Sequence, residues 1–217
     1  MIAMILAAGR GERLRPITDT IPKALMKVKG EILIDRHLQM LSACGIKIVV
    51  INLGWLGNKI ADHVGSGKRF GLQVIYSDEY ENVLDTGGGI CKALPLLGFE
   101  PFWVINADTY TEFQLPRKDL RRNLSGELVV VPNPSYKEVG DFDLIEGKIC
   151  NSLAPAYTFS GIARYHPEFF YGYKAERFSI VPLIRKAADS GKIGGLIFEK
   201  SWHDVGTPER LREINLK

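Results

Sequence analysis

The amino-acid sequence predicts an α/β fold with a mixed, mostly parallel β-sheet, and three observations support this prediction. Short apolar runs rich in Ile and Val alternate with amphipathic stretches, which is the pattern of βαβ units. The apolar runs have the length of strands that are buried on both faces of a parallel sheet. The 217 residues are 46% hydrophobic and 24% charged, an ordinary globular composition with enough chain for a large core. We therefore expect a single α/β domain over residues 1–217.

The first half of the chain alternates most regularly. Four apolar runs are predicted to be strands, namely Met1–Ala7, Ile46–Leu53, Leu72–Tyr76 and Phe102–Asn106. Three stretches between them are predicted to be helices, namely Ile34–Ala43, Leu56–Val64 and Gly89–Leu97. In the first of these helices, Ile34, Leu38 and Leu41 share one face at i, i+4, i+7 spacing. Right-handed crossovers through such helices would make the four strands parallel.

The second half is less regular and richer in β-structure. Three further strands are predicted, namely Glu127–Val131, Tyr157–Ala163 and Ile193–Glu199. The alternation over Gly140–Ile149 predicts a hairpin whose turn lies at Glu146-Gly147. Two helices are predicted at Ser179–Ser190 and Thr207–Ile214. Proline is tolerated near a helix start, so Pro182 fits the first helix, while Thr207 and Pro208 suit the N-cap and first position of the second.

Charge and cysteine content exclude several classes of protein. The 28 Lys+Arg residues exceed the 25 Asp+Glu residues by only three, which is too mild an excess for a duplex nucleic-acid-binding face. Three cysteines lie far apart without a CxxC pair, so we expect a reducing, cytoplasmic location. No apolar run reaches the roughly 18 residues of a transmembrane helix, and the N-terminus does not resemble a signal peptide. We expect neither nucleic acid nor a membrane as a partner.

A glycine-containing loop follows the first predicted strand directly. Gly9 and Gly11 lie within Leu6–Pro16, where small residues let backbone N–H groups approach phosphate oxygens. Four cationic side chains follow closely, namely Arg10, Arg13, Arg15 and Lys23. The third glycine of a dinucleotide fingerprint and the G-K-[ST] of a P-loop are both missing, which disfavours a dehydrogenase. On glycine spacing alone, a plain loop is as good an interpretation as a phosphate-binding loop.

Resemblance decides between these interpretations. Leu6–Pro16 followed by Pro22–Leu25 resembles the signature L-A-A-G-x-G-x-R-[LM]-x-P, then P-K-x-[LM], of the sugar-1-phosphate nucleotidyltransferase family. The resemblance implies a Rossmann-like three-layer fold with a nucleotide-binding part over about residues 1–110 and a β-rich sugar-binding part over about 111–217. It implies catalytic roles for Arg13 and Lys23 on the transferring phosphates. It also implies nucleotide contacts by Ala8, Gly9, Gly11, Glu12, Arg13, Lys23, Glu81, Thr86, Gly87, Gly88 and Asn106.

Two aspartates are the candidate metal ligands. Asp108 follows the strand Phe102–Asn106, and the carboxyl end of such a strand is where ligands bind in an open parallel sheet. It resembles the family's metal-binding and catalytic aspartate, although Ala107 replaces the usual glycine before it. Asp204 resembles the aspartate of the family's W-x-D-[VI]-G-[TS] element; taken alone, a turn or capping role would explain it better. Together they imply Mg²⁺, which takes one or two carboxylates plus phosphate oxygens.

The sequence patterns that indicate the nucleobase-binding and sugar-binding residues are less specific than those of the glycine-containing loop. Asp85–Gly89 opens a predicted helix and resembles the family segment that holds the base and ribose, while a flexible turn is the alternative. The resemblance places the sugar against Gly140, Asp141, Ser160 and Gly161. From the residues alone, Asp141 could simply start a hairpin, and Ser160-Gly161 could simply break a strand.

The resemblance implies a reaction of a nucleoside triphosphate with a sugar 1-phosphate that gives a nucleotide sugar and pyrophosphate. Several segments spread over the chain, including Asp85–Ile90, Gly140–Phe142 and Phe159–Ile162, resemble the branch of the family that transfers UMP to N-acetylmuramic acid 1-phosphate in peptidoglycan recycling. Guanylyl or thymidylyl transfer to mannose or glucose 1-phosphate is one alternative, and a non-catalytic nucleotide-sugar sensor is another. At 217 residues we expect the bare catalytic unit, without an appended β-helix or acetyltransferase domain, as a monomer or small homo-oligomer.

Overall fold

The computed structural model describes residues 1–80, 82–116 and 118–216. Within these residues the main sheet contains β1 Ile2–Leu6, β4 Ile48–Leu53, β5 Gln73–Asp78, β6 Phe102–Asn106, β8 Gly126–Pro132, β9 Asp143–Ile145, β10 Lys148–Cys150, β11 Tyr157–Tyr165 and β12 Ile193–Ile197. The helices are α1 Leu33–Ala43, α2 Gly57–Val64, α3 Asp85–Leu97, α4 Val181–Asp189 and α5 Pro208–Leu216. Two short ribbons pair β2 Lys27–Val28 with β3 Glu31–Ile32, and β7 Thr109–Thr111 with β13 Trp202–Asp204.

The main sheet is mixed and mostly parallel, as predicted. Its strand order is β5-β4-β1-β6-β11-β8-β12-β10-β9. The first four strands of that order are mutually parallel, with Ile5 of β1 opposite Ile51 on one side and Ile105 on the other. Then β11 runs antiparallel between β6 and β8, and β10 runs antiparallel between β12 and β9. Because the central strands are parallel, their carboxyl ends all reach the same edge of the sheet.

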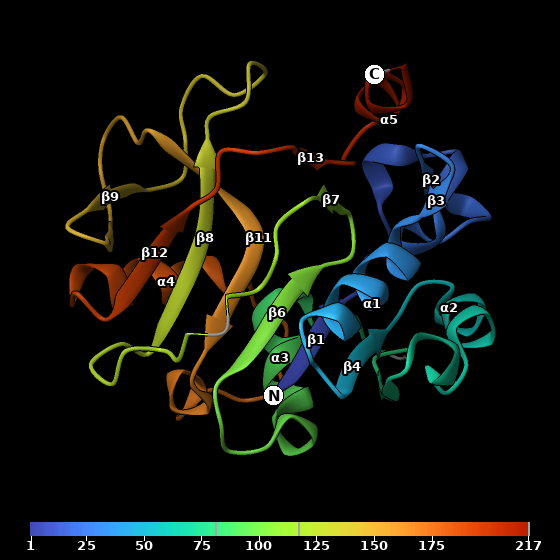
Figure 1. The fold of residues 1–217 in the computed structure, drawn as a ribbon, viewed down its shortest axis with the longest axis horizontal. Coiled ribbons are helices and arrows are strands. Elements are labelled where there is room, and N and C mark those ends of the chain that lie inside the picture. The colour runs from blue at the N-terminus through green and yellow to red at the C-terminus, as the bar shows by residue number, and fades with distance from the viewer. Residues whose placement is uncertain (81, 117, 217) are drawn as a thin grey trace.

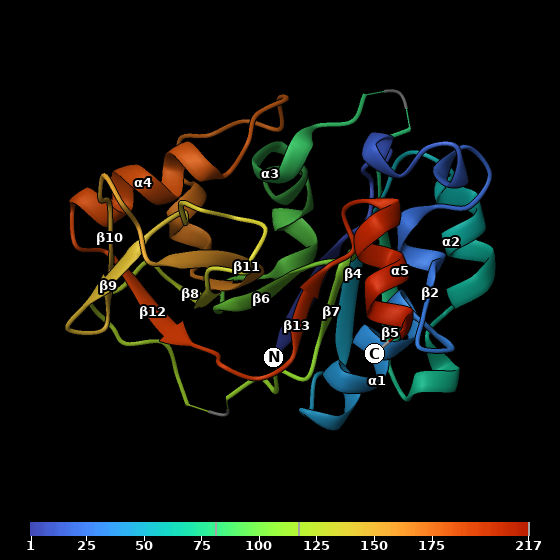
Figure 2. The ribbon, with the colours of Figure 1, turned by 90° about the horizontal axis from the view of Figure 1, so that it is seen from above.

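Helices cover both faces of this sheet. Alternate residues of a strand point to opposite faces, so Ala3 and Ile5 join the apolar cluster of α1 and α2, whereas Met4 joins the cluster of α3 and α4. Figures 1 and 2 show α3 and α4 on one side of the sheet and α1 on the other. Each buried Leu or Ile side chain contributes about 1.5–3 kcal/mol relative to an exposed one. The result is the three-layer arrangement that the sequence predicted.

A third, smaller apolar cluster lies beyond the carboxyl ends of the strands. It joins Leu14 and Met26, from the segment after β1, to Tyr110 of β7, Val205 after β13 and Ile214 of α5. All five side chains are almost fully buried. This satellite cluster therefore holds the last helix against the glycine-containing loop segment.

Most predicted elements are confirmed, within a residue or two at their ends. The hairpin turn lies at Glu146 and Gly147, whose φ angles of 49° and 74° are those of a type I′ turn. Thr207 precedes α5 and accepts a 3.4 Å hydrogen bond from the backbone N–H of Arg210, as an N-cap does. The third helix begins at Asp85, which confirms that Asp85–Gly89 opens a helix and shows that the range Gly89–Leu97 was too short. The glycines lie in the first two turns of α3.

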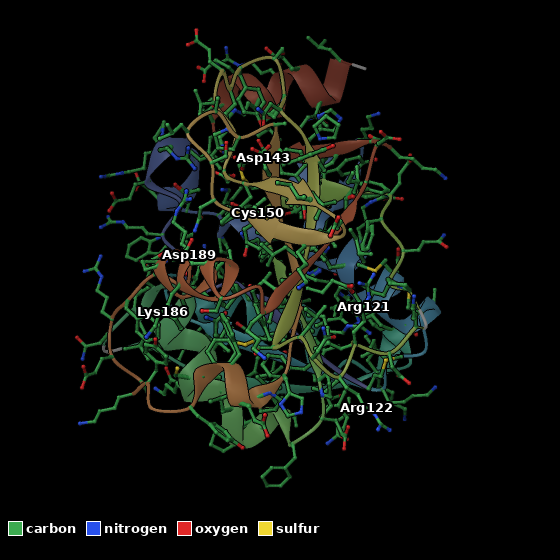
Figure 3. All side chains as sticks on the ribbon, turned by 90° about the vertical axis from the view of Figure 1, so that its left-hand side faces the viewer. Arg121, Arg122, Asp143, Cys150, Lys186 and Asp189 are labelled. Atoms are coloured by element: carbon green, nitrogen blue, oxygen red, sulfur yellow. The ribbon has the colours of Figure 1, made fainter. Side chains whose placement is uncertain are left out.

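The edge of the sheet farthest from β5 is the hairpin β9–β10, which packs next to α4 (Figure 3). Asp189 at the end of α4 accepts a 2.7 Å hydrogen bond from Nδ2 of Asn151. Asp143 accepts a 2.8 Å hydrogen bond from the backbone N–H of Ala156, and this bond lowers the pKa of Asp143. Charged side chains of this kind disfavour pairing of an edge strand with another chain. Among the described residues, no helix has the length and apolar character needed to cross a membrane.

Candidate active site

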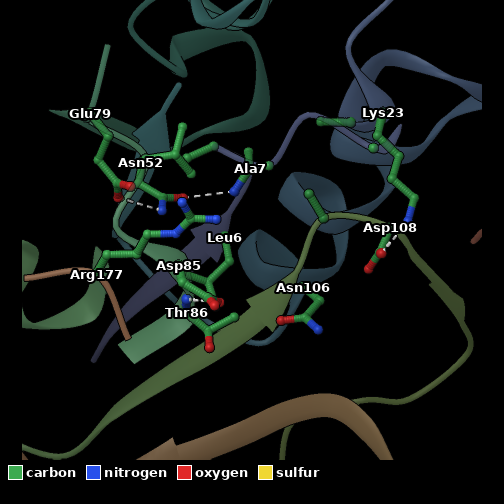
Figure 4. Close-up of a pocket in the computed structure, with 16 residues that line it drawn as sticks. Leu6, Ala7, Lys23, Asn52, Glu79, Asp85, Thr86, Asn106, Asp108 and Arg177 are labelled. Atoms are coloured by element: carbon green, nitrogen blue, oxygen red, sulfur yellow. Dashed lines mark hydrogen bonds and ion pairs between the residues drawn. The ribbon is translucent and has the colours of Figure 1, made fainter. Parts of the chain in front are cut away.

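A cavity of about 340 Å³ opens at the carboxyl ends of β1, β4 and β6. Figure 4 shows Arg177 at one end of it and Lys23 with Asp108 at the other. Seven predicted site residues line this cavity, namely Ala8, Gly9, Gly11, Lys23, Thr86, Asn106 and Asp108. The parallel strands thus bring together segments that are far apart in the sequence, as the position of ligand sites in open α/β sheets requires.

A buried polar network fixes the start of the glycine-containing loop. Oδ1 of Asn52 accepts a 2.7 Å hydrogen bond from the backbone N–H of Ala7, and Nδ2 donates to Oε1 of Glu79 at 2.8 Å. The other carboxylate oxygen of Glu79 accepts from the backbone N–H of Leu84 at 2.9 Å. Asn52 and Glu79 are almost fully buried, so each bond replaces one that water would otherwise make. The network ties β1, β4 and β5 together at the cavity wall.

Short 3₁₀ turns after β1 position the cationic side chains. Arg13 lies on the turn Glu12–Leu14, and Lys23 lies on the turn Lys23–Leu25. The ammonium of Lys23 forms an ion pair with Oδ2 of Asp108. The guanidinium of Arg10 instead lies over the Trp55 ring, 4.4 Å from its centroid. Of these cations, Lys23 and Arg13 line the cavities that meet at Asp108.

The N-terminus of α3 is closed by the protein itself. The backbone N–H groups of Gly87 and Gly88 donate to the carbonyl of Phe178 at 3.0 and 3.3 Å. The Thr86 hydroxyl accepts a 2.9 Å hydrogen bond from the backbone N–H of Ile180. Thr86 lines the cavity, whereas Gly87 and Gly88 are buried under the segment 176–178 and do not line it. Close packing of the segment 176–178 therefore explains why these positions are glycine, and no ligand is needed to explain it.

The variant Gly88→Ala is expected to lose about 1–3 kcal/mol of unfolding free energy, the usual cost of overpacking. A Cβ atom at this position would lie 1.8 Å from the backbone carbonyl oxygen of Glu176, so the covering segment must move. Urea unfolding monitored by circular dichroism measures the loss. Gly9→Ala is the matched control, because a Cβ there meets nothing within 4 Å. Equal stability of the two variants would contradict the close packing at Gly88.

The ribbon β7–β13 brings the two predicted metal ligands together. Asp204 pairs with Thr109 across the ribbon, and the backbone N–H of Val205 donates to the carbonyl of Asp108 at 3.0 Å. Asp204 also forms a 2.7 Å ion pair with Nη1 of Arg210. Burial and the Asp108 carboxylate raise the pKa of Asp204. The two carboxylates therefore repel each other and share a region in which positive charge is favourable.

These two side chains fit the requirements of a divalent cation. The Asp108 and Asp204 side chains are 28% and 27% exposed, so incoming ligands can reach both. Mg²⁺ takes hard oxygen ligands, with one or two carboxylates from the protein and further oxygens from phosphates and water. No group of three or more His, Cys, Asp or Glu side chains that could hold a metal occurs in the described ranges.

A second cavity, of about 430 Å³, shares Asn106 and Asp108 with the first. It is lined by Arg13, Asn106, Asp108, Thr109, Tyr136, Lys137, Asp141, Thr158, Phe159, Ser160, Gly161, Trp202, Asp204 and Arg210. Its floor is an irregularity in β11, where the register shifts between Phe159 and Ile162. Gly161 has a φ of +79° there, and a Cβ atom would lie 2.7 Å from Nδ2 of Asn106. The absence of a side chain at Gly161 thus leaves room for the Asn106 side chain between the two cavities.

The predicted sugar residues occupy different positions around this cavity. Asp141 lines it, and its Oδ2 accepts a 2.9 Å hydrogen bond from the backbone N–H of Phe159. Ser160 also lines it, but its hydroxyl donates to the carbonyl of Val129 at 2.7 Å and its own carbonyl accepts from Nε1 of Trp202 at 2.9 Å. Gly140 does not line it; its backbone N–H donates to the carbonyl of Pro155.

Several residues at the cavities were not in the predicted set. Asn52, Glu79, Asp85 and Arg177 line the first cavity, and Tyr136, Lys137, Trp202 and Arg210 line the second. Asn52 had a usable signal, because a polar residue near the end of an apolar strand faces the ligand edge of the sheet. Glu12 lies in an adjoining cavity that shares Gly11 and Arg177 with the first. The predicted residue Glu81 lies outside the described residues.

Comparison with known proteins agrees with this geometry. A family model described as nucleotidyl transferase matches residues 2–125, more than half of the chain. The chain belongs to the nucleotidyl transferase family. This nucleotidyl transferase is 41% identical to the N-acetylmuramate alpha-1-phosphate uridylyltransferase of Neisseria meningitidis serogroup B, over 98% of this chain and 96% of the relative. It is 31% identical to the protein of the same name from Caulobacter vibrioides, over 96% and 93% of the two chains.

Solved structures support the fold of this nucleotidyl transferase. A putative glucose-1-phosphate thymidylyltransferase from Bacillus anthracis, crystallised in complex with a sucrose, superposes with a TM-score of 0.85. The superposition covers 100% of this chain and 94% of that one at 20% sequence identity. At this identity the likeness concerns the fold alone, and it confirms the Rossmann-like α/β nucleotidyltransferase architecture predicted from the sequence.

Proposed function

We propose that this nucleotidyl transferase transfers UMP from UTP to N-acetylmuramic acid 1-phosphate and releases pyrophosphate. One observation carries the proposal: two cavities, each large enough for part of a substrate, meet at Asn106 and Asp108. A nucleotide in the first and a sugar phosphate in the second would have their reacting groups beside the same carboxylate pair. The choice of UTP and of the muramate rests on the names of the two relatives that match nearly the whole chain.

In the proposed reaction, an oxygen of the sugar phosphate attacks the α-phosphorus of UTP, and the bond to the β-phosphate oxygen breaks. The electron pair leaves with pyrophosphate, so phosphorus and charge balance without an added reagent. The nucleophile is an anion at neutral pH, which removes the need for a general base. Arg13 and Lys23 would hold the non-bridging oxygens on which negative charge is concentrated. A divalent cation held by Asp108 and Asp204 would supply further charge neutralisation there.

In this proposal, residues 1–110, approximately, bind the nucleotide, and residues 111–217, approximately, bind the sugar. Arg177 is an exception, since it comes from the second half and lines the nucleotide cavity. Thr86, which lines the nucleotide cavity, and Glu81 remain in the proposed base-binding set, whereas Gly87 and Gly88 do not line that cavity. Asp141, Ser160 and Gly161, which line the second cavity, remain the proposed sugar set without Gly140. We also propose that the protein is cytoplasmic, that it acts in peptidoglycan recycling, and that it is a monomer or a small homo-oligomer.

Pyrophosphate release with a panel of nucleoside triphosphates and sugar 1-phosphates tests the proposal. We expect UTP with N-acetylmuramic acid 1-phosphate to give the highest kcat/KM, with turnover that requires Mg²⁺. A higher value for GTP with mannose 1-phosphate, or for dTTP with glucose 1-phosphate, would favour the corresponding rival. Binding of nucleotide sugars without any turnover would favour a sensor.

A further inference from the structure

Lys137 is a cation in the sugar cavity that the proposed reaction does not use. It lies in the loop between β8 and β9, and its ammonium is 2.7 Å from Oδ2 of Asp141. We infer that Lys137 forms a subsite for a carboxylate on the sugar, at a distance from the sugar phosphate. This inference rests on the proposed function, and it assigns one residue to the recognition of the group that distinguishes a muramate.

The other cations in or near this cavity interact with the two predicted metal ligands. Arg210 forms a 2.7 Å ion pair with Asp204, and the charges of Arg13, Lys23 and Arg210 all lower the pKa of that carboxyl. The Lys23 ammonium is paired with Asp108. Lys137 has no part in these interactions in the described structure; its ion pair is with Asp141. The cavity therefore has a cation beside the carboxylate of Asp204 and a separate cation, Lys137, beside Asp141.

The position of Lys137 is fixed on the cavity wall. Asp141 Oδ2 accepts from both the Lys137 ammonium and the backbone N–H of Phe159, so the loop is tied to the start of β11. The Lys137 side chain is 30% exposed. An ammonium has three N–H donors, and one ion pair leaves donors for a second anion. A partly desolvated ammonium forms a stronger bond to a carboxylate than a fully exposed one does.

The chemistry of the proposed substrate matches this arrangement. N-acetylmuramic acid differs from N-acetylglucosamine by a lactyl ether on O3, which carries a carboxylate. C3 is separated from C1 by one ring carbon, so with the C1 phosphate beside Asp108 and Asp204 the lactyl carboxylate would extend from the ring into the same cavity. Lys137 lines this cavity, and its ion pair is with Asp141 and not with Asp108 or Asp204. A hydrogen bond between charged groups is worth about 1.5–3 kcal/mol, or about 10- to 150-fold in affinity.

The test compares two products, UDP-N-acetylmuramic acid and UDP-N-acetylglucosamine, by isothermal titration calorimetry, together with kcat/KM for the muramate phosphate. Lys137→Met keeps the aliphatic stem and removes the charge, and Lys137→Arg keeps the charge. In Lys137→Met we expect the ratio of the two product affinities, and kcat/KM for the muramate, to fall about 10- to 100-fold. Lys137→Arg should restore most of this loss. Lys186→Met, on an exposed position of α4 (Figure 3), is the matched control and should change neither value by more than about twofold.

Two results would overturn the inference, and they can be told apart. If the wild-type enzyme discriminates between the products but Lys137→Met weakens both equally, Lys137 has no carboxylate subsite and the proposed function still holds. If the wild-type enzyme does not favour the muramate at all, the proposed function and the subsite fail together.

Discussion

Replacing Asp108 with Asn is expected to lower turnover at least about 10²- to 10³-fold without unfolding the protein. Asn has the same shape but no negative charge, so the site loses one of the two carboxylates proposed to hold Mg²⁺ and the ion-pair partner of Lys23. Asp108 lies where the two cavities meet, and the side chain is partly exposed, so the fold does not depend on its charge. Pyrophosphate release at saturating substrates and Mg²⁺ measures the loss.

Asp62→Asn is the matched control for this prediction. Asp62 is exposed on α2, outside both cavities, and its replacement should leave turnover unchanged. Thermal unfolding should give similar midpoints for all three proteins, and calorimetric titration with Mg²⁺ should show weaker binding only in Asp108→Asn. Near-normal turnover or undiminished Mg²⁺ binding in that variant would refute the assignment of Asp108.

Lowering the pH from 7 to 4 is expected to reduce the unfolding free energy of the wild-type protein by about 3 kcal/mol more than that of His37→Gln. His37 lies on α1 and is 2% exposed. Burial lowers its pKa from 6.5 to about 4, against the smaller opposing effects of Asp108 and of hydrogen bonds to the backbone of Ala107 and Thr109. The neutral ring therefore lies beneath the turn that carries the proposed metal ligand.

The direction of this pH effect follows from the difference in proton binding between the folded and unfolded states. The folded-state pKa of His37 is below the unfolded value, so between pH 6.5 and about 4 the unfolded chain binds a proton that the folded chain does not. The stabilisation is fully present above pH 6.5 and is lost as the pH falls toward 4. A shift of one pKa unit corresponds to 1.36 kcal/mol, so the roughly 2.5 units give about 3 kcal/mol. Urea unfolding of both proteins at several pH values measures it, and parallel pH dependences would disprove the buried neutral state.

The regular part of the fold was predictable because its physical causes are local. The central strands are apolar except for a polar residue near the carboxyl end, since both faces are covered by helices. The runs Ile48–Leu53 and Phe102–Asn106 are therefore visible in the sequence. The type I′ turn at Glu146-Gly147 and the N-cap at Thr207 have residue preferences of their own. Such signals need no knowledge of what packs against them.

The rest of the site depends on contacts between distant segments. The ribbon β7–β13 has three residues in each strand, too few for a periodic pattern, yet it is what brings Asp204 to Asp108. The glycines at the start of α3 were expected to contact a ligand through their backbone, because the sequence does not reveal that the segment 176–178 covers them. Lys137 and Arg177 are single cations in irregular segments, where no local pattern separates a cavity-lining side chain from a solvated one.

The satellite cluster makes the completeness of the active site depend on the packing of the C-terminal helix. Leu14 and Met26 pack with Val205 and Ile214, so the residues that would hold the phosphates and the residue that would complete the metal site depend on one small apolar contact. Its partners are nearly two hundred residues apart, and contacts of such sequence separation are costly to close during folding. The site is therefore complete only when α5 and the segment before it are packed against the chain that follows β1.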